Sequence, residues 1–220
     1  MSLPPTDDER AVAAVNREVT RSQRAIACVA VVAGAVLIAA TLRLPRGSGG
    51  FYAAGFALAA VWLAAAVAHG RIQWWGKETG HREQVAAGVV GGVVTFAVFL
   101  AAAAIGRHIN LLAGPIDSVL GKADAGPVAA VLVLALVNGV AEELFFRGSL
   151  VDVSVARAPY IVSTAVYVAV TAVAGNTALT LAAAVMGTVF ASERRVSRGL
   201  VASILTHLVW STLIILLLPR

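Results

Sequence analysis

The stretch from Pro127 to Ser149, PVAAVLVLALVNGVAEELFFRGS, decides the fold class of this chain. It begins as an uncharged apolar run and ends with two adjacent carboxylates, Glu142 and Glu143, followed by Arg147. A charge near the centre of a membrane helix costs about 2.5–3.5 kcal/mol on insertion scales, and such residues mark functional sites by default. This segment therefore predicts both a membrane fold and the position of its site.

The remainder of the chain has the composition of a membrane protein. Of its 220 residues, 59% are hydrophobic and 13% are charged, and the mean hydropathy is +0.85. A soluble domain carries about 25% charged residues. A helix needs about 20 apolar residues to cross the hydrocarbon core. The uncharged runs that approach or exceed this length are 25–42, 51–68, 85–106, 126–141, 158–192 and 199–219.

The run 158–192 is too long for one crossing, and Gly175-Asn176 near its middle is a turn signal that divides it into two helices. We therefore predict an all-α fold, a polytopic membrane helix bundle of about seven transmembrane helices, within residues 25–220. Residues 1–24 are predicted to be a polar cytosolic N-terminal segment, either a solvated tail or a short amphipathic helix.

Three glycines in the third apolar run predict a close helix contact. Gly88, Gly91 and Gly92 stand at helical spacing in the sequence GVVGGVV. Small residues let the backbones of two membrane helices approach closely. We therefore interpret them as a packing signal. Cys28 is the only cysteine, which excludes an intrachain disulfide and a cysteine-based metal cluster.

The basic residues indicate topology and argue against nucleic-acid binding. The formal net charge is +5, but Lys and Arg are scattered between the apolar runs instead of gathered on one face. With a cytosolic N-terminus, twelve of them lie on the inner side and five on the outer side. Positively charged loops stay cytoplasmic. This bias predicts a multi-pass protein of the cell membrane with its N-terminus in the cytosol and its C-terminus outside.

Helical spacing divides the acidic pair into two roles. Glu143 and Arg147 are four residues apart, so they share one helical face and can pair. Glu142 points about 100° away from Glu143 and shares its face with Asn138 one turn earlier. We therefore predict Glu142 as a candidate base and Glu143 as a support that Arg147 neutralises. The alternative is three juxtamembrane charges solvated at a helix end.

The last apolar run adds one more ionisable residue, His207. It lies eight residues in from the cytosolic end of the run, which begins at Gly199. At about 1.5 Å per residue this places the imidazole roughly 12 Å deep, and Ser211 follows one turn later on the same face. We predict that His207 faces Glu142 across the bundle. The alternative is a buried histidine that only bonds another helix.

These residues resemble the signatures of a known family. AEELFFRG is similar to the first signature, E-E-x-x-x-R, of the CAAX protease and bacteriocin-processing family, also called the Abi family. SILTHLVWS resembles the third, a His followed four residues later by Asn or a similar residue. The members are multi-spanning intramembrane endopeptidases. The resemblance covers residues 131–216, with a family-like core at about 127–218, while the first 125 residues match only as hydrophobic spans.

The resemblance implies a role for each matching residue. Glu142 would activate a water for attack on a peptide carbonyl, while Glu143 and Arg147 would hold the helix end. His207 would bind the water, or a metal that polarises it. The position of Ser211 would stabilise the oxyanion, with Ser in place of the family's Asn.

The middle signature of the family, Phe-x-x-x-His, is not retained. The nearest match is YVAVT, from Tyr167 to Thr171, and no histidine lies between Glu143 and His207. A zinc site normally needs three protein ligands. Glu142 and His207 alone would hold a metal loosely, so zinc is weakly supported. His69 has the right depth for a substitute ligand. By their positions Tyr167, Thr171 and Asn138 are expected to bind substrate or water.

Two functions follow from these observations. The first is an intramembrane endopeptidase that cleaves a peptide bond at the cytosolic side of the bilayer, with the lipid bilayer and a peptide or membrane-protein substrate as partners. The second, motivated by Thr171, is a catalytically inactive relative that acts as a membrane binding or scaffold protein. A transporter ranks last, because the chain shows no convincing internal repeat.

Overall fold

The computed structural model describes residues 7–45, 47–123, 126–154 and 157–218, with side chains from residue 21 onward except 122 and 123. The described residues form helices and no strands, which confirms the all-α prediction. The elements are α1 (Asp7–Arg43), α2 (Gly49–His69), α3 (His81–Gly106), α4 (Asn110–Ala123), α5 (Val128–Glu142), the π-helix η1 (Glu143–Ser149), α6 (Leu150–Val153), α7 (Pro159–Ala172), α8 (Thr177–Ser197) and α9 (Val201–Leu217).

Four helical segments are long and apolar enough to cross a membrane. They are Arg21–Arg43, Gly49–His69, His81–Gly106 and Val128–Val153, the last of which joins α5, η1 and α6. Helices α7 and α9 are apolar but shorter, with 14 and 17 residues. At about 1.5 Å per residue α7 is roughly 21 Å long, short of the ~30 Å hydrocarbon core. The multi-pass class is confirmed, whereas the count of seven transmembrane helices is not.

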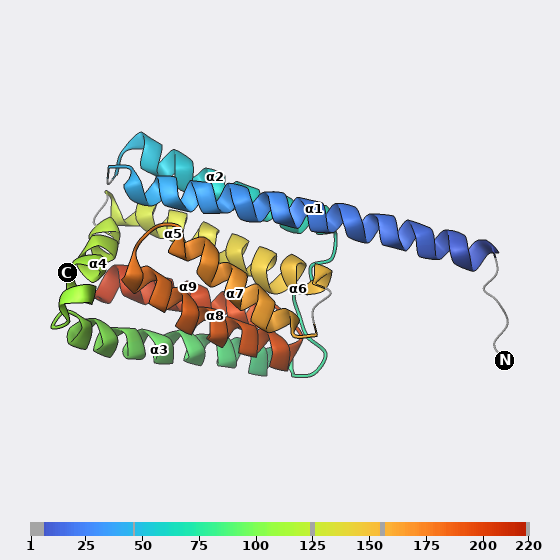
Figure 1. Ribbon diagram of the computed structural model, residues 1–220. Helices are drawn as coiled ribbons and strands as arrows, with labels where there is room; N and C mark the ends of the chain where they lie inside the picture. Colours follow the sequence, from blue (N-terminus) through green and yellow to red (C-terminus); the bar gives the residue numbers. More distant parts are fainter. Residues whose placement is uncertain (1–6, 46, 124–125, 155–156, 219–220) are drawn as a thin grey trace.

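The helices form a bundle in which α9 lies between α5 and α3 (Figure 1). Helix α2 packs on α5 from the other side, α1 packs on α2 and α7, and α7 pairs with α8. Helix α4 lies at the end of the bundle where the chain's C-terminus is found (Figure 1). Helix α1 runs past the bundle toward the N-terminus, so the segment 1–24 is helical from Asp7 and continuous with the first span. Residues 1–6 lie outside the described part.

Two local predictions are confirmed. Gly175 has a φ of 74°, and the Asn176 side chain accepts a hydrogen bond from the Leu179 N–H at 2.8 Å, so this pair ends α7 and caps α8. A Cβ on Gly88 would lie 2.6 Å from Leu205 Cβ, and one on Gly92 would lie 2.5 Å from Val209 Cβ. The glycines therefore bring α3 and α9 into close contact.

The end of the apolar segment that begins at Val128 differs from the predicted α-helix. Glu143–Ser149 is a π-helix, in which the Leu150 N–H bonds the Phe145 carbonyl five residues back. Ser163 Oγ on α7 donates to the Phe146 carbonyl at 2.5 Å. Arg194 Nε on α8 donates to the Arg147 carbonyl at 3.1 Å. Neighbouring helices thus supply partners to the wider turn, a kind of turn that is frequently found at functional sites.

An aromatic core holds the π-helix against α2. Phe145 stacks on Trp62 with ring centroids 4.6 Å apart, and Phe146 lies 4.9 Å from the same indole. All three side chains are buried, with at most 1% of their surface exposed. Burying aromatic surface of this size contributes several kcal/mol, as a rough estimate of ~25 cal/mol per Å² over 150–250 Å² per ring. This packing places the acidic residues that precede Phe145.

Candidate active site

Glu143 lies at the centre of a closed charge cluster where the π-helix begins. Its Oε1 atom is 3.4 Å from Arg147 Nη1 and 3.2 Å from His207 Nδ1. The side chains of Glu143 and Arg147 are both 0% exposed. The predicted pairing of Glu143 with Arg147 is confirmed.

The contact with His207 corrects one prediction. We expected Glu142 to face His207 directly, but the imidazole contacts Glu143. The prediction assumed a regular α-helix and had no information on the side from which α9 approaches. Both the π-turn and the side from which α9 approaches depend on packing between helices. They therefore cannot be predicted from the spacing of residues along the chain.

Glu142 has different surroundings from its neighbour. It is partly exposed, and its Oε2 atom accepts a hydrogen bond from the Tyr167 hydroxyl of α7 at 3.0 Å. The structure thus brings Tyr167, one of the residues expected to bind substrate or water, onto the candidate base. Of the two carboxylates, Glu142 is the one that a water or substrate can reach.

Arg147 is held by more than its carboxylate partner. Its Nη2 donates to the Gly187 carbonyl at 3.3 Å, and its guanidinium carbon lies 4.5 Å from the Tyr167 ring centroid and 5.0 Å from that of Phe190. A Cβ on Gly187 would lie 3.4 Å from the guanidinium, so the glycine leaves room for it. Cation–π contacts of this kind are worth about 2 kcal/mol when desolvated. Arg147 therefore has a fixed position between η1, α7 and α8.

The imidazole of His207 is held by Phe190 and has little room beside Gly139. The Phe190 ring stacks on it with centroids 4.7 Å apart and an interplanar angle of 17°. Gly139 has no side chain, and a Cβ there would lie 3.3 Å from His207 Cδ2 and 3.5 Å from Nε2. His207 is 7% exposed. Its Nδ1 edge is committed to Glu143, which leaves the Nε2 edge as the one available for chemistry.

The remaining predicted residues have other contacts. Asn138 Nδ2 donates to the carbonyls of Gly55 (3.1 Å) and Leu134 (2.9 Å), which ties α5 to α2. Thr171 is buried, and its hydroxyl donates to the Tyr167 carbonyl at 2.9 Å within its own helix. The donor groups of Asn138 and Thr171 are therefore used in packing. Ser211 is buried one turn after His207 on α9, as the spacing predicted.

The residues present do not fit a zinc ion. Within the described ranges no group of three or more His, Cys, Asp or Glu side chains is placed to hold a metal. Glu143 Oε1 faces a guanidinium, which repels a divalent cation. His69, the possible substitute ligand, belongs to a different cluster, because its Nε2 lies 3.4 Å from Asp152 Oδ2. Glu142 and His207 alone fall short of the usual three protein ligands.

Sequence reasoning missed the contribution of α8. Gly187, Phe190 and Arg194 contact the Arg147 side chain, the His207 ring and the Arg147 carbonyl, respectively. Glu193 Oε1 also accepts a hydrogen bond from Thr206 Oγ1, next to His207, at 2.6 Å. The positions 187, 190 and 194 recur at the spacing of one helical face. That periodicity was the available signal, although it does not say which site the face lines.

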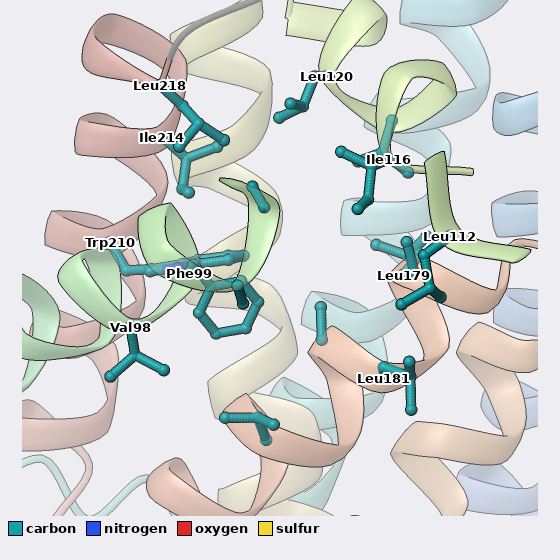
Figure 2. Close-up of a pocket in the computed structure, with 16 residues that line it drawn as sticks. Val98, Phe99, Leu112, Ile116, Leu120, Leu179, Leu181, Trp210, Ile214 and Leu218 are labelled. Atoms are coloured by element: carbon teal, nitrogen blue, oxygen red, sulfur yellow. The ribbon is translucent and has the colours of Figure 1, made fainter. Parts of the chain in front are cut away.

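An apolar cavity lies farther along α9, toward the end of the bundle with α4. It has a volume of about 220 Å³ and hydrophobic side chains from α3, α4, α8 and α9 line it. Figure 2 shows Phe99 and Trp210 on one side of it, and Leu112 and Leu179 on the other. The Trp210 ring centroid also lies 6.1 Å from that of His207. The site and the cavity are therefore neighbours along α9, one polar and one apolar.

Comparison with known proteins adds one finding. Residues 124–213 match the family described as type II CAAX prenyl endopeptidase Rce1-like. The match covers less than half of the chain but includes the π-helix, Tyr167, His207 and Ser211. No curated protein and no solved structure matches the chain significantly. Residues 124–213 are thus similar to the type II CAAX prenyl endopeptidase Rce1-like family, in agreement with the family that the motif resemblance predicted.

Proposed function

We propose that this protein is an intramembrane endopeptidase that hydrolyses a peptide bond of a membrane-anchored peptide or membrane protein. The family match supports the reaction class. One observation carries the proposal: of two adjacent carboxylates, Glu143 is 0% exposed and neutralised, whereas Glu142 is partly exposed and hydrogen-bonded. Such a division suits one reacting group and one supporting group.

In this proposal Glu142 is the general base. It takes a proton from a water as the water oxygen attacks the peptide carbonyl carbon. A positioned base of this kind contributes about 10²–10⁴-fold to the rate. The partial exposure of Glu142 lets water reach it, and Tyr167 fixes the orientation of its carboxylate.

His207 has a supporting role that depends on its contact with Glu143. When Nδ1 is the protonated nitrogen, its N–H donates a hydrogen bond to Glu143 Oε1. The carboxylate then fixes this tautomer and leaves Nε2 as a hydrogen-bond acceptor. Nε2 then orients the attacking water. The Phe190 ring and the absent side chain of Gly139 hold the imidazole in that position. Arg147 balances the Glu143 charge, and Ser211 is the proposed oxyanion donor.

The orientation in the membrane is part of the proposal. The α2–α3 loop and the last turn of α8 carry the basic residues Arg71, Lys77, Arg194 and Arg195, and lie at the same end of the bundle (Figure 1). The positive-inside rule assigns that end to the cytosol of a cell-membrane protein. His207 lies two turns from the start of α9 at Val201, so a substrate would enter from the cytosolic side.

The test is cleavage by the purified full chain in liposomes. The substrate panel holds lipid-anchored fluorogenic peptides, including a farnesylated CAAX peptide because the family name points to that class. We expect at least one to be cleaved, and Glu142→Gln to lower kcat by about 10²–10⁴-fold. Glu78→Gln changes an exposed acid of the α2–α3 loop in the same way and serves as the control. Full activity of the Glu142→Gln protein would refute the proposal.

One observation favours a second function. The described residues offer no three-ligand metal site, and the Thr171 hydroxyl bonds its own helix. A catalytically inactive relative that binds a membrane partner would have these features as well. In that case the panel would show no cleavage, and Glu142→Gln would leave the cellular phenotype of the protein intact.

A further inference from the structure

Hydrolysis of a peptide bond requires two proton transfers, and the proposed function above accounts for only one. Water must lose a proton as it attacks, and the amine nitrogen must gain one as it leaves. Glu142 serves the first transfer. The second needs a donor that lies close to Glu142, is accessible, and can recover its proton afterwards.

Tyr167 meets these three requirements. Its hydroxyl lies 3.0 Å from Glu142 Oε2, and no other side-chain hydrogen bond to Glu142 occurs within the described residues. Tyr167 is partly exposed, like Glu142. By contrast, Glu143 and Arg147 are 0% exposed, and the Thr171 hydroxyl is used within its own helix. The phenol is therefore the proton donor that the structure places beside the candidate base.

The surroundings of the Tyr167 ring hold the phenol in place, and one of them is a cation. The guanidinium carbon of Arg147 lies 4.5 Å from the ring centroid, and the Phe146 ring contacts it edge-on at 5.0 Å. A Cβ on Gly187 would lie 3.2 Å from Tyr167 Cδ1, so this glycine lets the ring pack against α8. A nearby fixed cation stabilises the negative charge that develops on the phenol oxygen as it donates.

We infer that Tyr167 is a catalytic residue that protonates the leaving amine and recovers its proton from Glu142. This inference rests on the proposed endopeptidase function. It assigns the donor role to a hydroxyl that the family signature Phe-x-x-x-His does not contain, in a site whose residues do not fit zinc.

The proton transfers balance. The water oxygen forms a bond to the carbonyl carbon, and one water proton moves to Glu142. The carbon–nitrogen bond then breaks as the Tyr167 phenol proton moves to the nitrogen. The phenolate takes the proton from the Glu142 carboxyl across the 3.0 Å contact. A carboxylic acid and an amine leave, and both side chains return to their starting states.

The experiment compares the full-length wild type and Tyr167→Phe in liposomes on two substrates with the same acyl part. One is the amide, and the other is an aryl ester whose leaving group departs as an anion and needs no proton. Tyr167→Phe keeps the ring contacts with Arg147 and Phe146. We expect kcat to fall by about 10²–10⁴-fold on the amide and by less than about threefold on the ester.

Two controls separate chemistry from structure. Glu142→Gln should lower kcat on both substrates, because both need an activated water. Tyr160→Phe removes a phenol hydroxyl two turns earlier on α7 and should leave both rates unchanged. The thermal unfolding midpoint of Tyr167→Phe is measured to check that the protein is folded.

Each outcome bears on the inference. Equal losses on the amide and the ester would assign Tyr167 a structural role and overturn it, as would an unchanged amide rate. In both of those cases the endopeptidase function stands, because the wild type cleaves. If the wild type cleaves neither substrate, the proposed function and this inference fall together.

Discussion

Glu142 and Glu143 are adjacent residues of the same type, but their side chains lie in different environments on two sides of the helix. On the Glu143 side, α8 and α9 close over the carboxylate, and Arg147 and His207 contact one of its oxygens at 3.4 and 3.2 Å. On the Glu142 side, α7 supplies one hydroxyl and leaves the carboxylate partly exposed. What packs against a carboxylate therefore decides whether it supports the structure or is free to react.

The largest effect is expected from removing Arg147, the cation that pairs with the buried Glu143. Arg147→Met removes the cation but keeps most of the side-chain volume, so Glu143 stays buried without it. We expect the unfolding free energy to fall by about 3–5 kcal/mol, as for other broken buried ion pairs. Unfolding by SDS titration in mixed micelles measures it. Glu142→Gln, on the open side, should cost about 1 kcal/mol, and equal losses for both variants would contradict the distinction.

A smaller effect is expected from closing the space beside the imidazole. In Gly139→Ala the new methyl group would lie 3.3 Å from His207 Cδ2 and 3.5 Å from Nε2. Displacing the ring by a few tenths of an ångström should lower kcat roughly tenfold, about 1.4 kcal/mol. Gly114→Ala is the matched control, since nothing lies within 4 Å of a Cβ there. An unchanged kcat in Gly139→Ala would show that Nε2 is not used.

The π-turn itself can be tested through its partner on α7. Ser163→Ala removes the hydrogen bond to the Phe146 carbonyl, which is buried. The loss should be about 1 kcal/mol of unfolding free energy, and up to roughly 3 if the carbonyl finds no other donor. Ser192→Ala is the control, because that hydroxyl is exposed and bonds the Thr188 carbonyl of its own helix. A loss in Ser163→Ala no larger than in the control would mean that α7 does not stabilise the π-turn.

The smallest effect belongs to an ion pair of the same length in a different environment. Arg107 Nε and Asp117 Oδ1 are also 3.4 Å apart, but their side chains are 31% and 66% exposed. Asp117→Asn should change the unfolding free energy by less than about 0.5 kcal/mol, because water screens the pair. If Asp117→Asn lost nearly as much unfolding free energy as Arg147→Met, burial would not decide how much these ion pairs contribute to stability.

Several features of the site could be predicted from the sequence because they depend on neighbours along one helix. The Glu143–Arg147 pair follows from the i,i+4 spacing, and it survives the change from an α-turn to a π-turn. The division at Gly175-Asn176 follows from turn chemistry. The close approach at Gly88 and Gly92 follows from the missing side chains. Each of these needs only local geometry or residue size.

Other features could not be predicted because they depend on which helices meet. His207 was expected to face Glu142 but contacts Glu143, since the approach of α9 past Gly139 is a property of the whole bundle. Phe190 and Glu193 carry no motif, and their contacts with His207 and Thr206 appear only when α8 packs on α9. The count of seven membrane crossings is not confirmed, because an uncharged run does not reveal where a helix ends.

The sequence by itself determined the membrane class, the all-helical fold, the acidic segment as the place of interest and the similarity of residues 124–213 to the Rce1-like family. These depend on composition and on spacing along the chain. Only the tertiary structure decided that Glu143 is buried and also contacts His207, while Glu142 stays partly exposed beside Tyr167. The physical reason is that burial and pairing of a charge are set by side chains from other helices, and these come together only when the bundle has packed.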